Sequence, residues 1–181
     1  MRQNVIIQTL IIAGTLLALL VSIYCFRGAI LRSNSPEALK TVIQLFMPPI
    51  DLYQPLVSEG MDMSDGFVEK RLSYRHNYMG NHEIGVLLGN AGSELYRINI
   101  ELLASIVCAS SEGIRYTSSM TRGVSFLSKD GGGFGLDTYV VPRDLPLDSE
   151  ISCTITLSGI DADLIRKYGP ARIYIKKTSD M

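Results

Sequence analysis

The chain lacks an excess of either charge and is poor in metal-binding side chains. Its 181 residues include 17 Lys and Arg against 18 Asp and Glu, with only 2 His and 3 Cys. No basic stripe is present, so nucleic-acid binding has no electrostatic support, because it depends on Lys and Arg at phosphates. No internal repeat and no low-complexity tract is visible, so we expect neither a repeat array nor a compositionally biased segment.

Catalytic motifs are missing as well. No G-x-S-x-G turn presents a serine nucleophile, and the glycines at 131–135 do not fit a phosphate-binding loop, because Leu136 or Thr138 stands where the final glycine is required. His76 and His82 with Glu83 could supply zinc ligands, but no second Cys/His pair at ligand spacing accompanies them. We therefore expect no enzymatic activity, no metal and no cofactor.

The chain does contain a long apolar run without charge, at residues 5–26. At about 1.5 Å per residue this run forms a helix of roughly 33 Å, which matches the ~30 Å hydrocarbon core of a bilayer. A cleaved secretory signal is the alternative, but its apolar stretch is shorter and ends at small residues. Here the run ends in the bulky Tyr24 and Phe26 around Cys25. We predict a short tail at 1–4 and a transmembrane anchor at 5–26 that contacts membrane lipid.

The charges on either side of the run bear on its orientation. Arg2 precedes the run, whereas Arg27 and Arg32 follow it. A strict count of positive charges would keep the residues after the run in the cytoplasm. A very short tail, one span and a sizeable C-terminal domain is, in contrast, the usual layout of a signal anchor. We expect a single-pass membrane protein whose C-terminal domain is periplasmic or otherwise extracytoplasmic.

Residues 27–66 are expected to form a juxtamembrane linker that contains one short helix at 36–47. Ser35-Pro36 supplies an N-cap and a first helical residue, and Met47-Pro48-Pro49 ends the helix. The apolar residues between them recur at the helical spacing: Leu39, Val42, Ile43 and Phe46. The pattern predicts an amphipathic helix whose apolar stripe packs on the following domain or, alternatively, on the membrane surface.

Residues 67–181 show the two-residue alternation of β-strands. The clearest case is 96–109, where the even positions are apolar and most odd positions are polar. About seven such segments follow one another, separated mostly by turns rather than by helices. We predict an all-β fold, an antiparallel β-sandwich of the Ig-like kind.

The alternation also identifies residues that could form a disulfide, a polar cluster or a contact surface. Cys108 and Cys153 both lie on the apolar side of their strands, so they could form a disulfide worth about 2–4 kcal/mol, or remain two buried thiols. A hairpin at 67–88 places four polar and aromatic residues on one face near its turn: Tyr74, His76, Tyr78 and His82. The glycine cluster predicts an exposed loop that could contact a partner: Asp130, Gly131, Gly132, Gly133 and Phe134.

A span, a compact β-domain and no catalytic set together favour a non-enzymatic protein-binding module anchored in the bacterial cell envelope. It would be an immunity-type protein or an accessory subunit of a secretion or transport machine, and would bind another protein through loops or a sheet edge. One alternative is a small envelope-anchored hydrolase or carbohydrate-processing enzyme, with a titratable group of shifted pKa in a cleft. Another is a structural role in which the span oligomerises through Gly14 and Ala18.

Overall fold

The computed structural model describes residues 2–33, 35–52, 54–62, 66–111, 113, 115–128, 131–141 and 145–178. These residues belong to two compact units, a helical unit at Met1–Leu52 and a β-rich unit at Tyr53–Met181.

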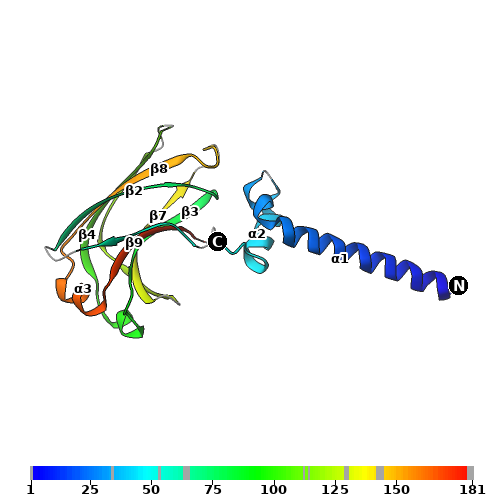
Figure 1. The fold of residues 1–181 in the computed structure, drawn as a ribbon, viewed down its shortest axis with the longest axis horizontal. Coiled ribbons are helices and arrows are strands. Elements are labelled where there is room, and N and C mark those ends of the chain that lie inside the picture. The colour runs from blue at the N-terminus through cyan, green and yellow to red at the C-terminus, as the bar shows by residue number, and fades with distance from the viewer. Residues whose placement is uncertain are drawn as a thin grey trace. The chain divides into compact units, whose positions relative to one another are not determined.

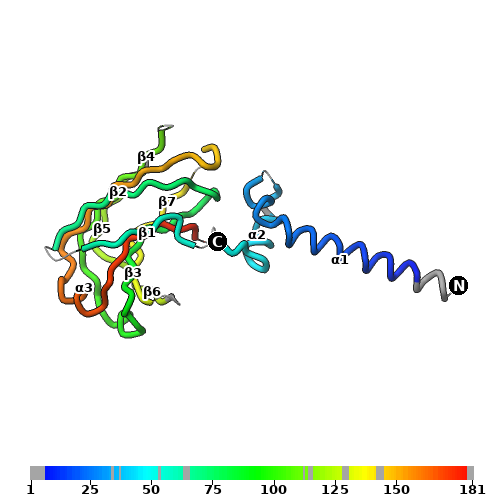
Figure 2. Tube along the Cα trace, viewed as in Figure 1, coloured from blue at the N-terminus to red at the C-terminus, as the bar shows by residue number. Residues whose placement is uncertain are grey.

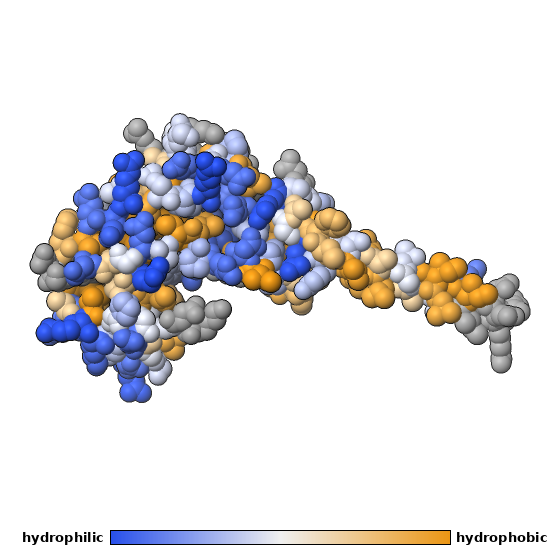
Figure 3. Space-filling view, viewed as in Figure 1, coloured by the Kyte–Doolittle hydropathy of each residue, from blue (hydrophilic) through white to orange (hydrophobic). Residues whose placement is uncertain are grey.

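The helical unit begins with the long helix α1, Arg2–Arg32, much of whose coloured surface is hydrophobic (Figure 3). Within the described residues it is the one helix long and apolar enough to cross a membrane. The helix continues beyond Phe26 into residues predicted to be linker. No proline interrupts residues 27–32, and Gly28 alone is a poor helix former that costs only about 1 kcal/mol.

The second helix of this unit, α2, spans Glu37–Phe46, close to the predicted 36–47. Pro36 occupies the N-cap position, and the Met47 N–H donates to the Ile43 carbonyl oxygen at the other end. The two helices contact each other. An ion pair of 3.1 Å joins Arg32, at the end of α1, to Asp51, beyond α2.

The β-rich unit consists of two antiparallel sheets (Figure 1). The five-stranded sheet has the order β1-β9-β3-β7-β6 and the four-stranded sheet the order β2-β8-β4-β5. The strands are β1 Pro55–Met61, β2 Phe67–Arg75, β3 Gly80–Leu88, β4 Glu101–Ser110, β5 Arg115–Arg122, β6 Val124–Ser128, β7 Gly131–Val141, β8 Glu150–Ser158 and β9 Ala171–Lys177. The prediction of a mostly β, antiparallel and sandwich-like fold is confirmed.

The strand order is nested rather than Ig-like. β1 pairs with β9, β2 with β8 and β3 with β7. Strands from the two ends of the chain thus pair with each other in order, from the outermost strands toward the middle of the sequence. This nesting is the connectivity of a jelly roll, with β6 added at one edge. An Ig domain keeps its first two strands in one sheet, whereas β1 and β2 lie in different sheets here, so the Ig-like assignment is not confirmed.

Two segments predicted to be irregular are strands in the structure. Residues 55–61, assigned to the linker, form β1 and pair with β9. The glycine cluster from residue 131 onward forms the first part of β7. The described part of the chain therefore has nine strands where the sequence predicted about seven.

The hydrophobic core lies between the two sheets. Strand β4 buries every second residue, and so does its neighbour β8, as their alternation predicts. Two short helical segments add buried side chains: η1, Ser93–Arg97, contributes Leu95, and α3, Ala162–Tyr168, contributes Leu164 and Tyr168. Tyr96, which the alternation placed in a strand, belongs to η1 and is exposed.

Candidate functional site

The four residues predicted to form a polar and aromatic cluster are all buried in the β-rich unit. Tyr74 lies in β2 and His82 in β3, while His76 and Tyr78 belong to the turn between those strands. The Asp148 N–H donates to the His76 carbonyl oxygen at 3.0 Å, which ties this turn to the start of β8. The Nδ1–H of His82 donates to the Gly80 carbonyl oxygen at 2.9 Å, so one ring nitrogen serves to hold the turn.

His82 is the middle member of an interior row that the sequence did not reveal. Tyr139 of β7 and Lys177 of β9 lie opposite it in register, and all three side chains are buried. The His82 and Tyr139 rings stack with centroids 5.6 Å apart. The Lys177 ammonium donates to the Thr178 carbonyl oxygen at 2.7 Å. The row thus places polar groups on the face of the five-stranded sheet that points into the core.

Tyr116 connects this row to the opposite sheet. Its ring, from β5, lies 5.6 Å from that of Tyr139, and its hydroxyl donates to Asp137 of β7 at 2.5 Å. Burial raises the pKa of Tyr116 to about 12, and the hydrogen bond to Asp137 acts in the same direction. Burial also acts to raise the pKa of Asp137, but hydrogen bonds from Ser118, Tyr116 and the Thr138 N–H outweigh it and lower that pKa. Neither group is poised to exchange a proton near neutral pH.

The described residues contain no group of three His, Cys, Asp or Glu side chains arranged to hold a metal ion. His76, His82 and Glu83, the set considered from the sequence, do not converge: Glu83 lies on the outer face, where it accepts a hydrogen bond from the Tyr174 hydroxyl of β9. Its carboxylate is also 3.4 Å from the Lys176 ammonium. Burial raises the pKa of Tyr174, and the bond to Glu83 raises it further.

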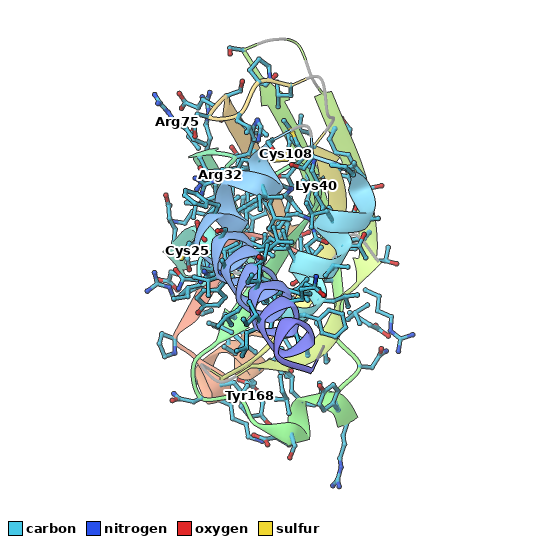
Figure 4. The ribbon with its side chains drawn as sticks, turned by 90° about the vertical axis from the view of Figure 1, so that its right-hand side faces the viewer. Cys25, Arg32, Lys40, Arg75, Cys108 and Tyr168 are labelled. Atoms are coloured by element: carbon cyan, nitrogen blue, oxygen red, sulfur yellow. A yellow bond between two sulfur atoms is a disulfide. The ribbon has the colours of Figure 1, made fainter. Side chains whose placement is uncertain are left out.

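Cys108 and Cys153 form a disulfide with an Sγ–Sγ distance of 2.05 Å (Figure 4 labels Cys108). They lie opposite each other in register on β4 and β8, and both are buried. Cys25 of α1 is free and exposed.

The glycine cluster is not the predicted contact loop. Gly131 to Phe134 lie in β7, and Phe134 is fully buried. Asp130 lies outside the described residues. A Cβ at Gly133 would be 2.3 Å from a carbonyl oxygen of β3 and 2.7 Å from the Phe126 ring. The glycines therefore permit close packing rather than flexibility.

Strand β6 is an edge strand with exposed apolar side chains. It pairs with β7 on one side and forms the border of the five-stranded sheet (Figure 2). Val124 is 73% exposed and Leu127 is 40% exposed. Phe126 lies on the outer face of the sheet, where its ring meets the Tyr174 ring edge to face, with centroids 6.1 Å apart.

The other three edge strands carry the features by which proteins discourage unwanted strand pairing. β1 begins at Pro55 and contains Glu59. β2 contains a series of charges, Glu69, Lys70, Arg71 and Arg75, and β5 has an arginine at each end. Among the edge strands that the structure describes, β6 alone has neither a charge nor a proline. We therefore take its outer edge as the candidate interaction site.

An open depression of about 480 Å³ lies where β4 begins and β5 ends. Glu101 and Arg122 face each other there in register, and the Asn99 amide donates to the Glu101 carboxylate at 2.8 Å. No histidine or cysteine is among the described residues that line it. The depression offers a carboxylate already engaged in hydrogen bonding, and the one hydroxyl among the described lining residues is that of Thr121.

Comparison with known proteins gives no family. No protein-family model matches the chain, and no curated protein matches its sequence. Among solved structures, a protein from Sulfurospirillum deleyianum is similar with a TM-score of 0.44 and 8% identity, over 68% of this chain and 97% of that one. A likeness this remote identifies neither a family nor a function.

Proposed function

We propose that the chain is a membrane-anchored, non-enzymatic module of the bacterial cell envelope that binds another protein through the edge of β6. Helix α1 crosses the membrane, and the β-rich unit lies on the extracytoplasmic side. The Cys108–Cys153 disulfide supports this side, because disulfides persist in oxidising compartments such as the periplasm.

The observation that carries the proposal is that β6, an edge strand, has no charge and no proline of its own. An edge strand presents backbone N–H and C=O groups that can pair with an extended segment of another chain. Val124 and Leu127 add exposed apolar contacts on that strand. The partner is thus a protein that supplies an extended segment, as suits an immunity-type protein or an accessory subunit of a secretion or transport machine.

The hydrolase alternative requires an acid or histidine poised near the working pH in a cleft. Asp137 has a lowered pKa and is held by several hydrogen bonds. Glu101 in the open depression has no histidine beside it among the described lining residues. These observations favour binding over catalysis as the proposed function.

Photocrosslinking in the native host tests the proposal. A photoreactive amino acid at Val124 should crosslink the full-length chain to a discrete partner. The matched control is Val140 of the inner strand β7, which is also a valine and is 63% exposed. We expect Val124→Lys to abolish the crosslinked partner's co-purification, and Val140→Lys to retain it. Equal crosslinking from both positions, or recovery of the bare monomer alone under gentle conditions, would contradict binding at β6.

A further inference from the structure

Helix α2 and the turn after it present a cluster of exposed apolar side chains. Val42 is 45%, Leu45 48%, Phe46 76% and Ile50 82% exposed. At about 100° per residue, Val42, Leu45 and Phe46 fall within an arc of about 100° of the helix, and Lys40 and Gln44 lie on the opposite side. Exposed apolar side chains grouped in this way indicate a surface that something apolar covers.

Chain length limits how far this cluster can be from the bilayer. Helix α1 has 31 residues and is about 46 Å long, which exceeds the ~30 Å hydrocarbon core. Its last two turns, with Arg27 and Arg32, therefore reach the headgroup region when the apolar part spans the core. Residues 33–36 extend at most about 3.6 Å each, so α2 begins within roughly 20 Å of the end of α1.

The ion pair between Arg32 and Asp51 further limits how far the turn after α2 can be from the end of α1. It places the Asp51 carboxylate, one residue after Ile50, at 3.1 Å from the guanidinium of Arg32 at the end of α1. Ile50, the most exposed of the four apolar residues, is thus kept beside the point where the span leaves the hydrocarbon. Residues 27–51 carry three basic side chains, Arg27, Arg32 and Lys40, and two acidic ones, Glu37 and Asp51 (Figure 4 labels Arg32 and Lys40). Because Asp51 pairs with Arg32, the apolar side chains rather than net charge are what would hold α2 at the lipid surface.

We propose that α2 is an interfacial helix, with Phe46 and Ile50 inserted among the headgroups and upper acyl chains of the membrane that α1 crosses. This inference rests on the proposed anchoring by α1 and adds a second, surface contact with lipid. That contact fixes where the chain leaves the bilayer before β1 begins.

Tryptophan fluorescence can test the insertion directly, because the natural sequence contains no tryptophan. Phe46→Trp and Ile50→Trp are compared in the full-length chain, reconstituted in vesicles of phosphatidylcholine and phosphatidylglycerol. Lys40→Trp reports the polar side of α2, and Leu16→Trp reports the middle of α1. We expect lipids brominated near the headgroup to quench most of the fluorescence of Phe46→Trp and Ile50→Trp. Lys40→Trp should instead be quenched by acrylamide in the water.

The outcomes that would overturn the inference differ from those that would overturn the anchor. Emission of Phe46→Trp at short wavelength, without quenching by brominated lipid, would place the residue against protein and refute insertion. Quenching by acrylamide alone would place it in water, with the same result. In both cases Leu16→Trp remains quenched by deeply brominated lipid. If Leu16→Trp also escapes that quenching and the chain fails to float with the vesicles, the anchor and the interfacial helix are both refuted.

Discussion

Removing the Cys108–Cys153 disulfide should destabilise the β-rich unit by an amount that its position determines. The two cysteines are 45 residues apart, and for a loop of that length the chain-entropy relation gives about 4 kcal/mol. Measured effects are usually somewhat smaller, about 2–4 kcal/mol. Both residues are buried, so truncation to alanine adds a small packing loss. We expect the double variant Cys108→Ala/Cys153→Ala to lose about 2–4 kcal/mol of unfolding free energy.

Urea unfolding of the full-length chain in detergent, followed by the fluorescence of its 9 tyrosines, measures this loss. Heating should give a melting temperature lower by about 10 °C. Cys25→Ala is the matched control and should change neither value, because Cys25 is free and exposed on α1. Reductant should act slowly on the native protein, since the buried disulfide is reached only through opening of the fold. A double variant as stable as the parent would refute the reasoning.

Four further predictions concern Tyr116, Asp137 and Gly133, two of them Tyr116. Tyr116→Phe should cost about 1 kcal/mol of unfolding free energy, because it removes a hydrogen bond to a partly exposed carboxylate; an unchanged urea midpoint would contradict this. The folded pKa of Asp137 is lowered, so its contribution to stability is complete above about pH 4 and is lost as the pH falls below that value. Asp137→Asn should flatten this acid limb of the stability curve, and a curve of unchanged shape would argue against the role. The folded pKa of Tyr116 is raised to about 12, so its contribution is lost as the pH rises from about 10 towards 12. Tyr116→Phe should reduce the alkaline loss of stability without abolishing it, because burial also raises the pKa of Tyr74 and of Tyr174. Gly133→Ala should cost about 2 kcal/mol or more through overpacking. Gly60→Ala, at a position with nothing within 4 Å of the added carbon, is its control, and equal stability of the two variants would be inconsistent with close packing at Gly133.

The alternation of apolar and polar residues predicted the strands whose side chains point in turn to the core and to solvent. It failed for strands in which apolar and polar residues do not alternate. β4 and β8 were found because each buries every second side chain. β1 begins with Pro55 and contains Gly60, residues that indicate a loop when only neighbours in sequence are considered. The beginning of β7 was missed because its glycines carry no side chains and so show no alternation.

Pairing partners could not be predicted, because they are set by contacts between distant parts of the chain. Ser58 of β1 lies opposite Tyr174 of β9 and is hydrogen-bonded to Arg172, and no local pattern links these segments. The same limit applies to the interior row. His82 was placed on the buried side by its own strand, but Tyr139 became its neighbour only through the pairing of β3 with β7. Local alternation thus predicts which side a residue faces, and not what it meets there.

The glycines of β7 also explain how β6 is attached to its sheet. The Phe126 ring can lie over Gly133 because Gly133 has no side chain, and a Cβ there would occupy the space of the ring. The ring is held there against Tyr174, so β6 is attached to its sheet by a contact on the outer face as well as by its hydrogen bonds to β7. Val124 and Leu127 take no part in that contact and remain exposed. We therefore expect a lysine at position 124 to change the edge presented to the proposed partner without affecting this contact. A change at Phe126 would also loosen the strand, so a loss of binding could not be distinguished from a loss of folding.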